Sequence, residues 1–417
     1  MKNYDLIVKP SKLTGEVIAP SSKSFAHRIL ISAFLSGEEV IVKNLGTSVD
    51  VEVTLNALKA MGATVKEIEN GIIIKRGNTF CNGVTVDCVE SGSSLRFLLP
   101  VASAFGINVT FTGSKRLLER PISELTKVLN QNGADIVGYT VNGKLKAGKF
   151  FIDGSISSQY VTGLLLALSV IDGESEIIIN GKLVSKPYVD ITLSVLKEFG
   201  VKFKQTENGY IIYGGYNLAK TEFTVEGDWS GSAFILASGA IGGKVIVSGL
   251  NLNSCQGDMK IVDILKRFGA KITCQNDNIT VEKASLTAIT YDMEDIPDLC
   301  QIVAVVGAYA KGETVLTGVN RLKLKESDRI SAIVNSLSLA GVKVSYDGDK
   351  IVIFGGNGIK NAIIDGGNDH RTVMSAIVML SGANGVSKVT GAQAINKSYP
   401  EFIKDFKRIG GDVDVAI

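Results

Sequence analysis

Hydrophobic and polar positions along this chain follow a pattern that recurs six times. Each copy has the end of an amphipathic helix, a glycine and two short strands of alternating polarity, as in ALKAMGATVKEIENGIIIKRG at 57–77. The glycines stand about 70 residues apart, at Gly62, Gly133, Gly200, Gly269, Gly341 and Gly410. A glycine there suits a left-handed helix C-terminus, and the strand pairs often turn through Asn-Gly or Asp-Gly. The spacing therefore predicts six copies of one structural unit.

A second motif lies between these segments, with a polar head, an apolar helix of roughly a dozen residues and a strand ending in glycine. One copy is SSQYVTGLLLALSVIDGESEIIING at 157–181. Helices that are apolar almost all round belong in an interior. A doubly wound parallel fold would instead place its helices outside. We therefore predict an α/β fold in which each unit has two helices and four strands, with helices inside and sheets outside.

Three units per globule give two pseudo-threefold domains joined by a hinge. The fourth apolar helix starts near Asp228, which sets the boundary. The N-terminal strand, YDLIVKP, precedes the first copy and is expected to pair with the C-terminal half. We expect an inserted domain at 20–226 and a discontinuous domain made of 1–19 and 227–417.

Composition argues against several classes of protein. Among 417 residues, 44 Lys and Arg balance 42 Asp and Glu, without the basic excess or charge runs of a nucleic-acid binder. Five scattered cysteines without a C-x-x-C pair disfavour a disulfide framework or a metal site. The N-terminus has no apolar signal region, and no apolar run approaches the ~20 residues of a membrane span. We expect a cytoplasmic protein that binds neither membrane nor nucleic acid.

Cations recur at the heads of the apolar helices. Free N–H groups and the helix dipole favour anions there. A Lys or Arg at a helix head is therefore unfavourable unless an anion lies between its side chain and the helix N-terminus. For a single Ser or Asp at these heads, N-capping is an alternative explanation. The cations are Lys23, Arg28, Arg96, His370 and Arg371, and others follow the repeat strands at Arg120, Lys186, Arg321, Lys325, Arg329 and Lys397. A solvated surface charge is the alternative for each of the latter alone, but together they predict a substrate with several negative charges.

Two carboxylates stand among these cations. Glu326 lies between Lys325 and Arg329, and Asp298 directly follows Pro297. Surrounding positive charge keeps a carboxylate ionised and able to act as a base. The absence of G-x-S-x-G, H-E-x-x-H and G-x-x-x-x-G-K-[ST] disfavours a serine hydrolase, a zincin and a P-loop enzyme.

A set of short segments, in its order along the chain, resembles the 5-enolpyruvylshikimate-3-phosphate synthase family. The segments are PSSKSFAHR, ESGSSLR, ERPI, SSQY, SKPYVDITL, EGDWS, DIPDL, KESDR, DHR and NKSYPEF. The resemblance covers essentially the whole chain and implies two inverse α/β barrels of three βαβαββ units each. It implies transfer of the carboxyvinyl group of phosphoenolpyruvate to the 5-hydroxyl of shikimate 3-phosphate, with release of phosphate and no cofactor or metal. A monomer whose domains close on the ligands is expected.

The resemblance also assigns site residues. Contacts to shikimate 3-phosphate are implied for Lys23, Ser24, Arg28, Ser157, Ser158, Gln159, Ser185, Tyr188, Asp298 and Lys325. Contacts to phosphoenolpyruvate, whose site the inhibitor glyphosate occupies in this family, are implied for Lys23, Gly92, Arg120, Gln159, Arg329, Arg371 and Lys397. Glu326 and Lys23 are the candidates for proton transfer, and Asp298 for orienting or deprotonating the hydroxyl.

Three positions depart from the family pattern, and two other interpretations stay open. The departures are Glu90, Arg321 and Val49. One alternative is the sister enzyme that acts on UDP-N-acetylglucosamine, which uses a loop cysteine that TGSKRLLERPI lacks. The other is a non-catalytic protein of the same fold, which would be free to lose Lys23, Glu326 or Asp298.

Overall fold

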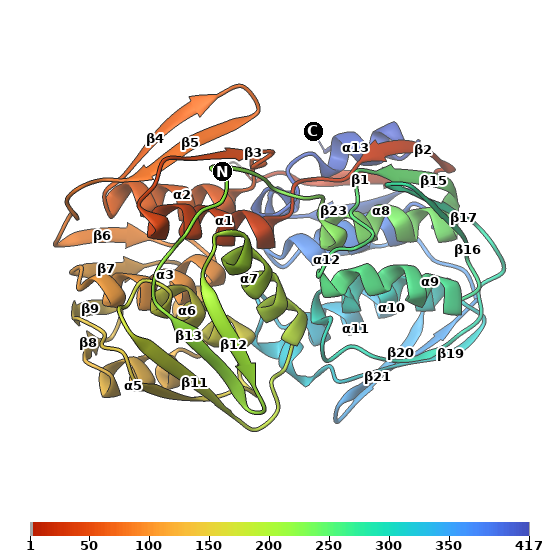
Figure 1. Cartoon of the computed structure of the whole chain (residues 1–417). Coiled ribbons are helices and arrows are strands. Elements are labelled where there is room, and N and C mark those ends of the chain that lie inside the picture. Colours follow the sequence, from red (N-terminus) through yellow and green to blue (C-terminus); the bar gives the residue numbers. More distant parts are fainter. Residues whose placement is uncertain (1–2, 417) are drawn as a thin grey trace. The chain divides into compact units, whose positions relative to one another are not determined.

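The computed structural model describes residues 3–416, which divide into two units. One unit is Ser21–Glu226, and the other combines the chain up to Pro20 with the chain from Gly227 onward. In each unit, three four-stranded sheets surround a set of buried helices (Figure 1).

The Ser21–Glu226 unit follows the predicted alternation of helices and strands. Its helices are α1 (Lys23–Ser36), α2 (Val49–Ala60), α3 (Gly92–Phe105), α4 (Lys115–Glu119), α5 (Ser123–Gln131), α6 (Ser158–Leu168) and α7 (Lys186–Glu198). Its strands are β3 (Val40–Lys43), β4 (Ala63–Ile68), β5 (Gly71–Arg76), β6 (Val84–Asp87), β7 (Val109–Thr112), β8 (Ala134–Val137), β9 (Thr140–Gly143), β10 (Lys149–Asp153), β11 (Glu174–Asn180), β12 (Lys202–Thr206), β13 (Gly209–Tyr213) and β14 (Glu222–Thr224).

The second unit is built in the same way. Its helices are α8 (Trp229–Gly242), α9 (Ile261–Arg267), α10 (Cys300–Tyr309), α11 (Arg329–Leu339), α12 (His370–Leu380) and α13 (Phe402–Arg408), with 3-10 turns at Gly257–Lys260, Pro297–Leu299, Asn320–Leu324 and Ala392–Lys397. Its strands are β1 (Leu6–Lys9), β2 (Leu13–Ile18), β15 (Gly243–Ser248), β16 (Lys271–Gln275), β17 (Asn278–Glu282), β18 (Thr290–Asp292), β19 (Gly312–Thr317), β20 (Lys343–Asp347), β21 (Lys350–Gly355), β22 (Ile363–Asp365), β23 (Ser387–Thr390) and β24 (Asp412–Val415).

Every sheet has the same strand pattern, two parallel strands next to an antiparallel pair, which is a hairpin in five sheets and β1 with β24 in the sixth. In the sheet of order β6-β7-β9-β8, β6 and β7 are parallel, whereas β9 is antiparallel to β7 and β8. A parallel pair needs a crossover, which α3 supplies, so the unit reads βαβαββ. Distant segments complete three of the other sheets: β14 pairs with β3, β2 with β15, and β1 with β23 and β24.

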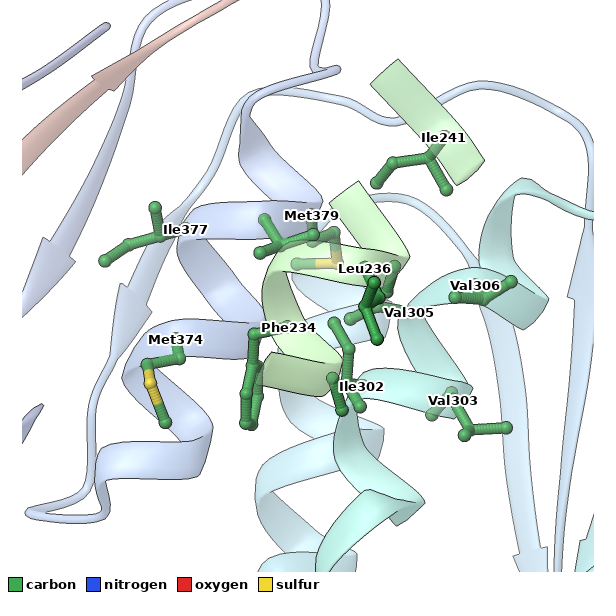
Figure 2. Close-up of a cluster of buried hydrophobic side chains, with 14 of the residues drawn as sticks. Phe234, Leu236, Ile241, Ile302, Val303, Val305, Val306, Met374, Ile377 and Met379 are labelled. Carbon is green, nitrogen blue, oxygen red and sulfur yellow. The ribbon is translucent and has the colours of Figure 1, made fainter. Parts of the chain in front are cut away.

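The apolar helices form the interior of each unit, as predicted. In α8, every residue from Trp229 to Ile241 is buried. Figure 2 shows Phe234 and Leu236 of α8, Ile302 and Val305 of α10 and Met374 of α12 in the shared core. Burying such side chains contributes roughly 1.5–3 kcal/mol each, which favours this inward arrangement.

The six repeat glycines all adopt the left-handed backbone that the sequence predicts. Each stands two residues beyond the last residue of its helix, with φ between 74° and 112°. Because a side chain is unfavourable at such φ values, glycine ends each helix and leads into the strand that follows.

Candidate active site

Lys23 is the first residue of α1 and forms an ion pair within its own unit. Its Nζ lies 2.7 Å from Asp50 Oδ2 on α2, and both side chains are largely buried. Ser22 caps the helix by accepting a hydrogen bond from the Phe25 amide. Asp50 follows Val49, one of the positions that depart from the family pattern, and the departure leaves this carboxylate in place.

Arg28 lies one turn further along α1 and is buried. Its Nε donates to Thr192 Oγ1 at 2.7 Å, and its terminal nitrogens donate to the carbonyl oxygens of Ser24 at 2.7 Å and Tyr188 at 2.8 Å. Ser185 precedes α7 with a φ of 52°, which turns the chain into the helix that carries Tyr188. The structure thus brings the predicted residues of α1 and α7 together around one guanidinium.

The heads of α3 and α6 are joined through Gln159. Its Oε1 accepts from Arg96 Nη1 at 2.7 Å, and its Nε2 donates to Ser93 Oγ at 3.1 Å. Ser157 caps α6 by accepting from the Gln159 amide, and Ser158, the first helical residue, is buried. These contacts fix the side chain of Gln159 between two helix heads.

Gly92, the first residue of α3, lies against Arg120. A Cβ added at Gly92 would lie 2.6 Å from Arg120 Nη1, so the guanidinium occupies the space that a side chain would need. The preceding loop carries Glu90 and Val89, which adopts a φ of 51°. A positive φ is unusual for a β-branched residue, so this loop holds a strained turn directly before the helix head.

In the other unit, Arg329 is the centre of a network of ion pairs. It begins α11, and its side chain is 1% exposed. Its Nη1 lies 2.8 Å from Asp298 Oδ1, its Nη2 2.8 Å from Glu326 Oε2 and its Nε 2.8 Å from Asp369 Oδ2. Burial alone would lower the pKa of Arg329, but the three carboxylates raise it above its usual range. The guanidinium therefore stays charged.

Asp298 contacts two further predicted cations. Lys325 Nζ lies 3.3 Å from Asp298 Oδ1, and Arg371 Nη2 lies 3.1 Å from Asp298 Oδ2. Arg371 also donates to the Asp298 carbonyl at 2.8 Å and to Ser230 Oγ at 2.8 Å. Burial lowers the pKa of Lys325, and Asp298 opposes that shift. Five predicted residues (Asp298, Lys325, Glu326, Arg329 and Arg371) therefore meet in one place.

Asp369 joins the heads of α11 and α12. It caps α12 by accepting from the Arg371 amide at 2.9 Å, and it also accepts from Ser327 Oγ and Arg329. Burial would raise its pKa, but Arg329 and then His370 hold the pKa at about 2. Lys397 ends the 3-10 turn Ala392–Lys397 and donates to the carbonyl of Asn368, one residue before this cap.

The sequence interpretation missed the partners that neutralise these cations within the protein. It left a bound anion as the reason for cations at helix heads, whereas Asp50 balances Lys23, and Asp369 together with Asp298 balances Arg329. Asp369 stands in the DHR segment, so its place before a helix was the available signal. Lys186, another of the predicted cations, pairs with Asp190 one turn away on α7.

Two further structural features of residues 3–416 concern membranes and metal ions. No helix in this range is long and apolar enough to cross a membrane. No group of three His, Cys, Asp or Glu side chains in the same range is arranged to hold a metal ion. The five cysteines are reduced, and Cys88 and Cys300 are buried.

The fold matches that of a solved enzyme. It superposes on the EPSP synthase from Acinetobacter baumannii with a TM-score of 0.84 at 24% sequence identity, covering 99% of this chain and 100% of that chain. This likeness confirms the predicted fold of helices enclosed by sheets. The fold defines the class of protein, one whose α/β units enclose their helices within sheets.

Comparisons over the whole sequence identify the family. The model for EPSP synthase (3-phosphoshikimate 1-carboxyvinyltransferase) matches residues 7–406. Proteins named 3-phosphoshikimate 1-carboxyvinyltransferase from Brachyspira hyodysenteriae and Clostridium novyi are 40% and 36% identical to this chain. The matches cover 98% and 99% of this chain, and 99% of each relative. The chain belongs to the EPSP synthase family of the shikimate pathway, and the predicted family and enzyme class are confirmed.

Asp369 makes the stability of the protein depend on pH. Its folded pKa of about 2 lies below the ordinary value near 4, so its ionised form stabilises the fold above about pH 4 and this contribution is lost as the pH falls toward 2. We expect Asp369→Asn to have a lower free energy of unfolding than wild type at pH 7. The difference between the two free energies should narrow by about 2 kcal/mol as the pH falls from 5 to 2. Urea unfolding of both proteins across this pH range measures the two free energies.

Asp412→Asn is the control, because Asp412 forms an exposed ion pair with Lys9. This variant should follow the wild-type pH dependence. A constant difference between Asp369→Asn and wild type at all pH values would contradict the assignment.

Proposed function

We propose that the charged residues at the helix heads carry out the carboxyvinyl transfer of the family on phosphoenolpyruvate and shikimate 3-phosphate. The observation that supports this most directly is the Arg329 network. It holds two carboxylates, Asp298 and Glu326, 2.8 Å from one buried guanidinium, with Lys325 and Arg371 beside them. Such a group combines anion-binding cations with proton-accepting carboxylates, and the transfer needs both.

For the Ser21–Glu226 unit, we propose mainly contacts to shikimate 3-phosphate. Arg28 and Lys23 supply charge, and the other contacts are Ser24, Ser157, Ser158, Gln159, Ser185 and Tyr188. Gly92 and Arg120, with Lys23 and Gln159, are the proposed contacts of this unit to phosphoenolpyruvate. From the other unit, Arg329, Arg371 and Lys397 bind phosphoenolpyruvate, while Asp298 and Lys325 bind shikimate 3-phosphate.

The ion pairs of Arg329 give its carboxylates a role in the reaction. The Nη2 nitrogen of Arg329 has two hydrogens, and these are donated to Glu326 and Asp369. An anion that binds this nitrogen therefore competes with Glu326, the more exposed of the two carboxylates. Binding therefore frees the Glu326 carboxylate beside the ligand, where it can exchange a proton. Asp298 stays fixed by Lys325 and Arg371 and orients the attacking hydroxyl.

The proposed reaction has two steps that balance in protons. In the first, the 5-hydroxyl loses its proton to Asp298 as its oxygen adds to C2 of phosphoenolpyruvate, and C3 receives a proton, which gives a tetrahedral intermediate. In the second, C3 loses a proton and the bond from C2 to the phosphate oxygen breaks. Lys23 and Glu326 transfer the protons to and from C3, and the cations stabilise the charge on the departing phosphate.

We also propose that the enzyme works as a monomer in the cytoplasm. Five cysteines without a disulfide agree with a reducing compartment. Light scattering on the purified protein should give the mass of one 44.3 kDa chain, with and without substrates. A mass of twice that value at micromolar concentration would refute the monomer.

Replacing Glu326 tests its role. Glu326→Gln keeps the shape but removes the base, and Arg329 keeps its bonds to Asp298 and Asp369. We expect a folded protein whose kcat falls by ~10²- to 10⁴-fold while substrate binding survives. Phosphate release from phosphoenolpyruvate with shikimate 3-phosphate as acceptor measures this.

Glu313→Gln, on the exposed face of β19, is the control and should keep wild-type activity. UDP-N-acetylglucosamine as acceptor should give no phosphate release. Activity of Glu326→Gln within about threefold of wild type would remove Glu326 from the mechanism.

Replacing Gly92 tests the phosphoenolpyruvate contacts. Because the new methyl meets Arg120 Nη1 at 2.6 Å, Gly92→Ala must displace the guanidinium. We expect a raised KM for phosphoenolpyruvate and a larger rise in the inhibition constant of glyphosate, which is longer and leaves less room for a methyl. The KM for shikimate 3-phosphate should change little.

Gly148→Ala is the matched control, since its Cβ would meet only Asn132 Oδ1, at 3.4 Å. Steady-state kinetics and inhibition at varied phosphoenolpyruvate measure all three constants. Equal losses for phosphoenolpyruvate and glyphosate would show that the methyl does not discriminate between them.

A further inference from the structure

A buried chain of hydrogen bonds joins α1, α2 and α3 in the Ser21–Glu226 unit. His27 Nδ1 on α1 lies 2.7 Å from Thr54 Oγ1 on α2. Thr54 Oγ1 lies 2.7 Å from Ser94 Oγ on α3, and Ser94 Oγ lies 2.7 Å from Ser91 Oγ, the cap of that helix. All four residues are at most 1% exposed. The chain therefore links the interior of α1 to the head of α3 without water.

The hydrogen bonds from His27 to Ser91 all run in one direction, because each hydroxyl has a single proton to donate. Ser94 donates its hydroxyl proton to Ser91, so the bond between Thr54 and Ser94 must use the proton of Thr54. Thr54 then has no proton left for His27, which must itself be the donor. His27 is therefore protonated on Nδ1.

The other ring nitrogen explains why His27 stays neutral. Nε2 is buried and has no hydrogen-bond partner among residues 3–416, so a second proton there would be a buried donor without an acceptor. Burial, followed by the charges of Lys23 and Arg28, lowers the pKa of His27 well below its usual value. His27 is thus a fixed hydrogen-bond donor rather than an acid or base.

The same contact lies beside the proposed substrate-binding cations. Lys23 and His27 are one turn apart on α1, and their partners Asp50 and Thr54 are one turn apart on α2. The two helices are therefore joined at two successive turns. The ring of Phe97, on α3, packs edge-on against His27, with 6.3 Å between ring centroids.

Phe97 also contacts the next residue of α1. The Arg28 guanidinium carbon lies 5.1 Å from the centre of the Phe97 ring. One face of α1 thus meets α2 through polar bonds and α3 through an aromatic ring. A shift of His27 would therefore move Lys23 and Arg28 relative to Gly92.

We propose that His27 is a positioning residue, whose neutral Nδ1–H donor holds the cation-bearing head of α1 in register with the heads of α2 and α3. The proposal rests on the proposed substrate contacts of Lys23 and Arg28. Its distinguishing consequence is that only a side chain able to donate from the Nδ1 position can replace His27.

Three substitutions test this consequence. In His27→Asn, the amide nitrogen reaches the Nδ1 position and can donate to Thr54. In His27→Gln, the longer amide reaches the Nε2 position instead, and His27→Leu has no donor. We expect kcat/KM within about threefold of wild type for Asn and a loss of at least tenfold for Gln and Leu, mainly through raised KM for both substrates.

Thr54→Val removes the partner of His27 at nearly constant shape. We expect the loss in Thr54→Val to resemble that in His27→Leu, and the double variant to lose little more than either, because both break the same bond. Rates are measured well below the melting temperature of each variant, which circular dichroism determines. Two outcomes would overturn the positioning role. One is a loss of kcat/KM that is fully explained by the fraction of each variant that is unfolded, and the other is a loss in the double variant equal to the sum of the two single losses.

The tautomer provides a readout besides activity. The chain has two histidines, so ¹⁵N-histidine labelling gives two sets of ring signals, and His27→Asn identifies those of His27. We expect the Nδ1–H tautomer, without titration from pH 5.5 to 8.5. An Nε2–H tautomer, or titration near 6.5, would refute the proposal.

Lys23→Met separates this proposal from the proposed function. Wild-type activity in Lys23→Met would count against the assigned role of Lys23 and leave the hydrogen-bond chain as a structural feature. A strong loss in Lys23→Met, with wild-type kinetics in His27→Leu, would refute the positioning role alone.

Discussion

The buried guanidinium of Arg329 is the charge on which the arrangement of one unit depends. A charge removed from water is costly unless it is paired and fully hydrogen-bonded, and three carboxylates meet that need here. The same carboxylates fix other parts of the unit, since Asp369 caps α12 and Asp298 holds Arg371. Breaking the network at one residue would therefore disturb three helix heads at once.

The repeated fold explains why such heads occur together. Each βαβαββ unit places an apolar helix inside its sheet, with a polar head where the strand enters the helix. In the Ser21–Glu226 unit the heads are joined by one ion pair, Lys23 with Asp50, and by the hydrogen bonds of Arg28, Gln159 and His27, whereas in the other unit they are joined mainly by the ion pairs of Arg329. The same scaffold thus supports two chemical solutions to one packing problem.

These networks also bear on reactivity. A carboxylate that pairs with a buried cation in the free enzyme can be released when an anionic ligand takes its place, because the cation must remain paired. Glu326 is suited to this exchange, since its side chain is 22% exposed whereas that of Asp369 is fully buried. This partial exposure agrees with the proton-transfer role proposed for Glu326, whereas the buried Asp369 holds two helix heads together.

The sequence alone determined the repeated architecture. Six glycines at a regular spacing and six helices apolar on all sides are local signals, set by backbone conformation and burial, and they required sheets outside and helices inside. The motifs also indicated the family and the predicted site residues. What they could not supply was the pairing of side chains that are distant along the chain, such as Asp50 with Lys23 or Thr192 with Arg28.

Only the tertiary structure decided these pairings. Neighbouring helices bring together residues 27 to 164 positions apart, and no local periodicity encodes which hydroxyl or carboxylate will meet which cation. The direction of the hydrogen bonds from His27 to Ser91 likewise depends on three distances between separate helices. The sequence determined which elements form because their signals are local, whereas the charge balance of the site had to await the packing of those elements against one another.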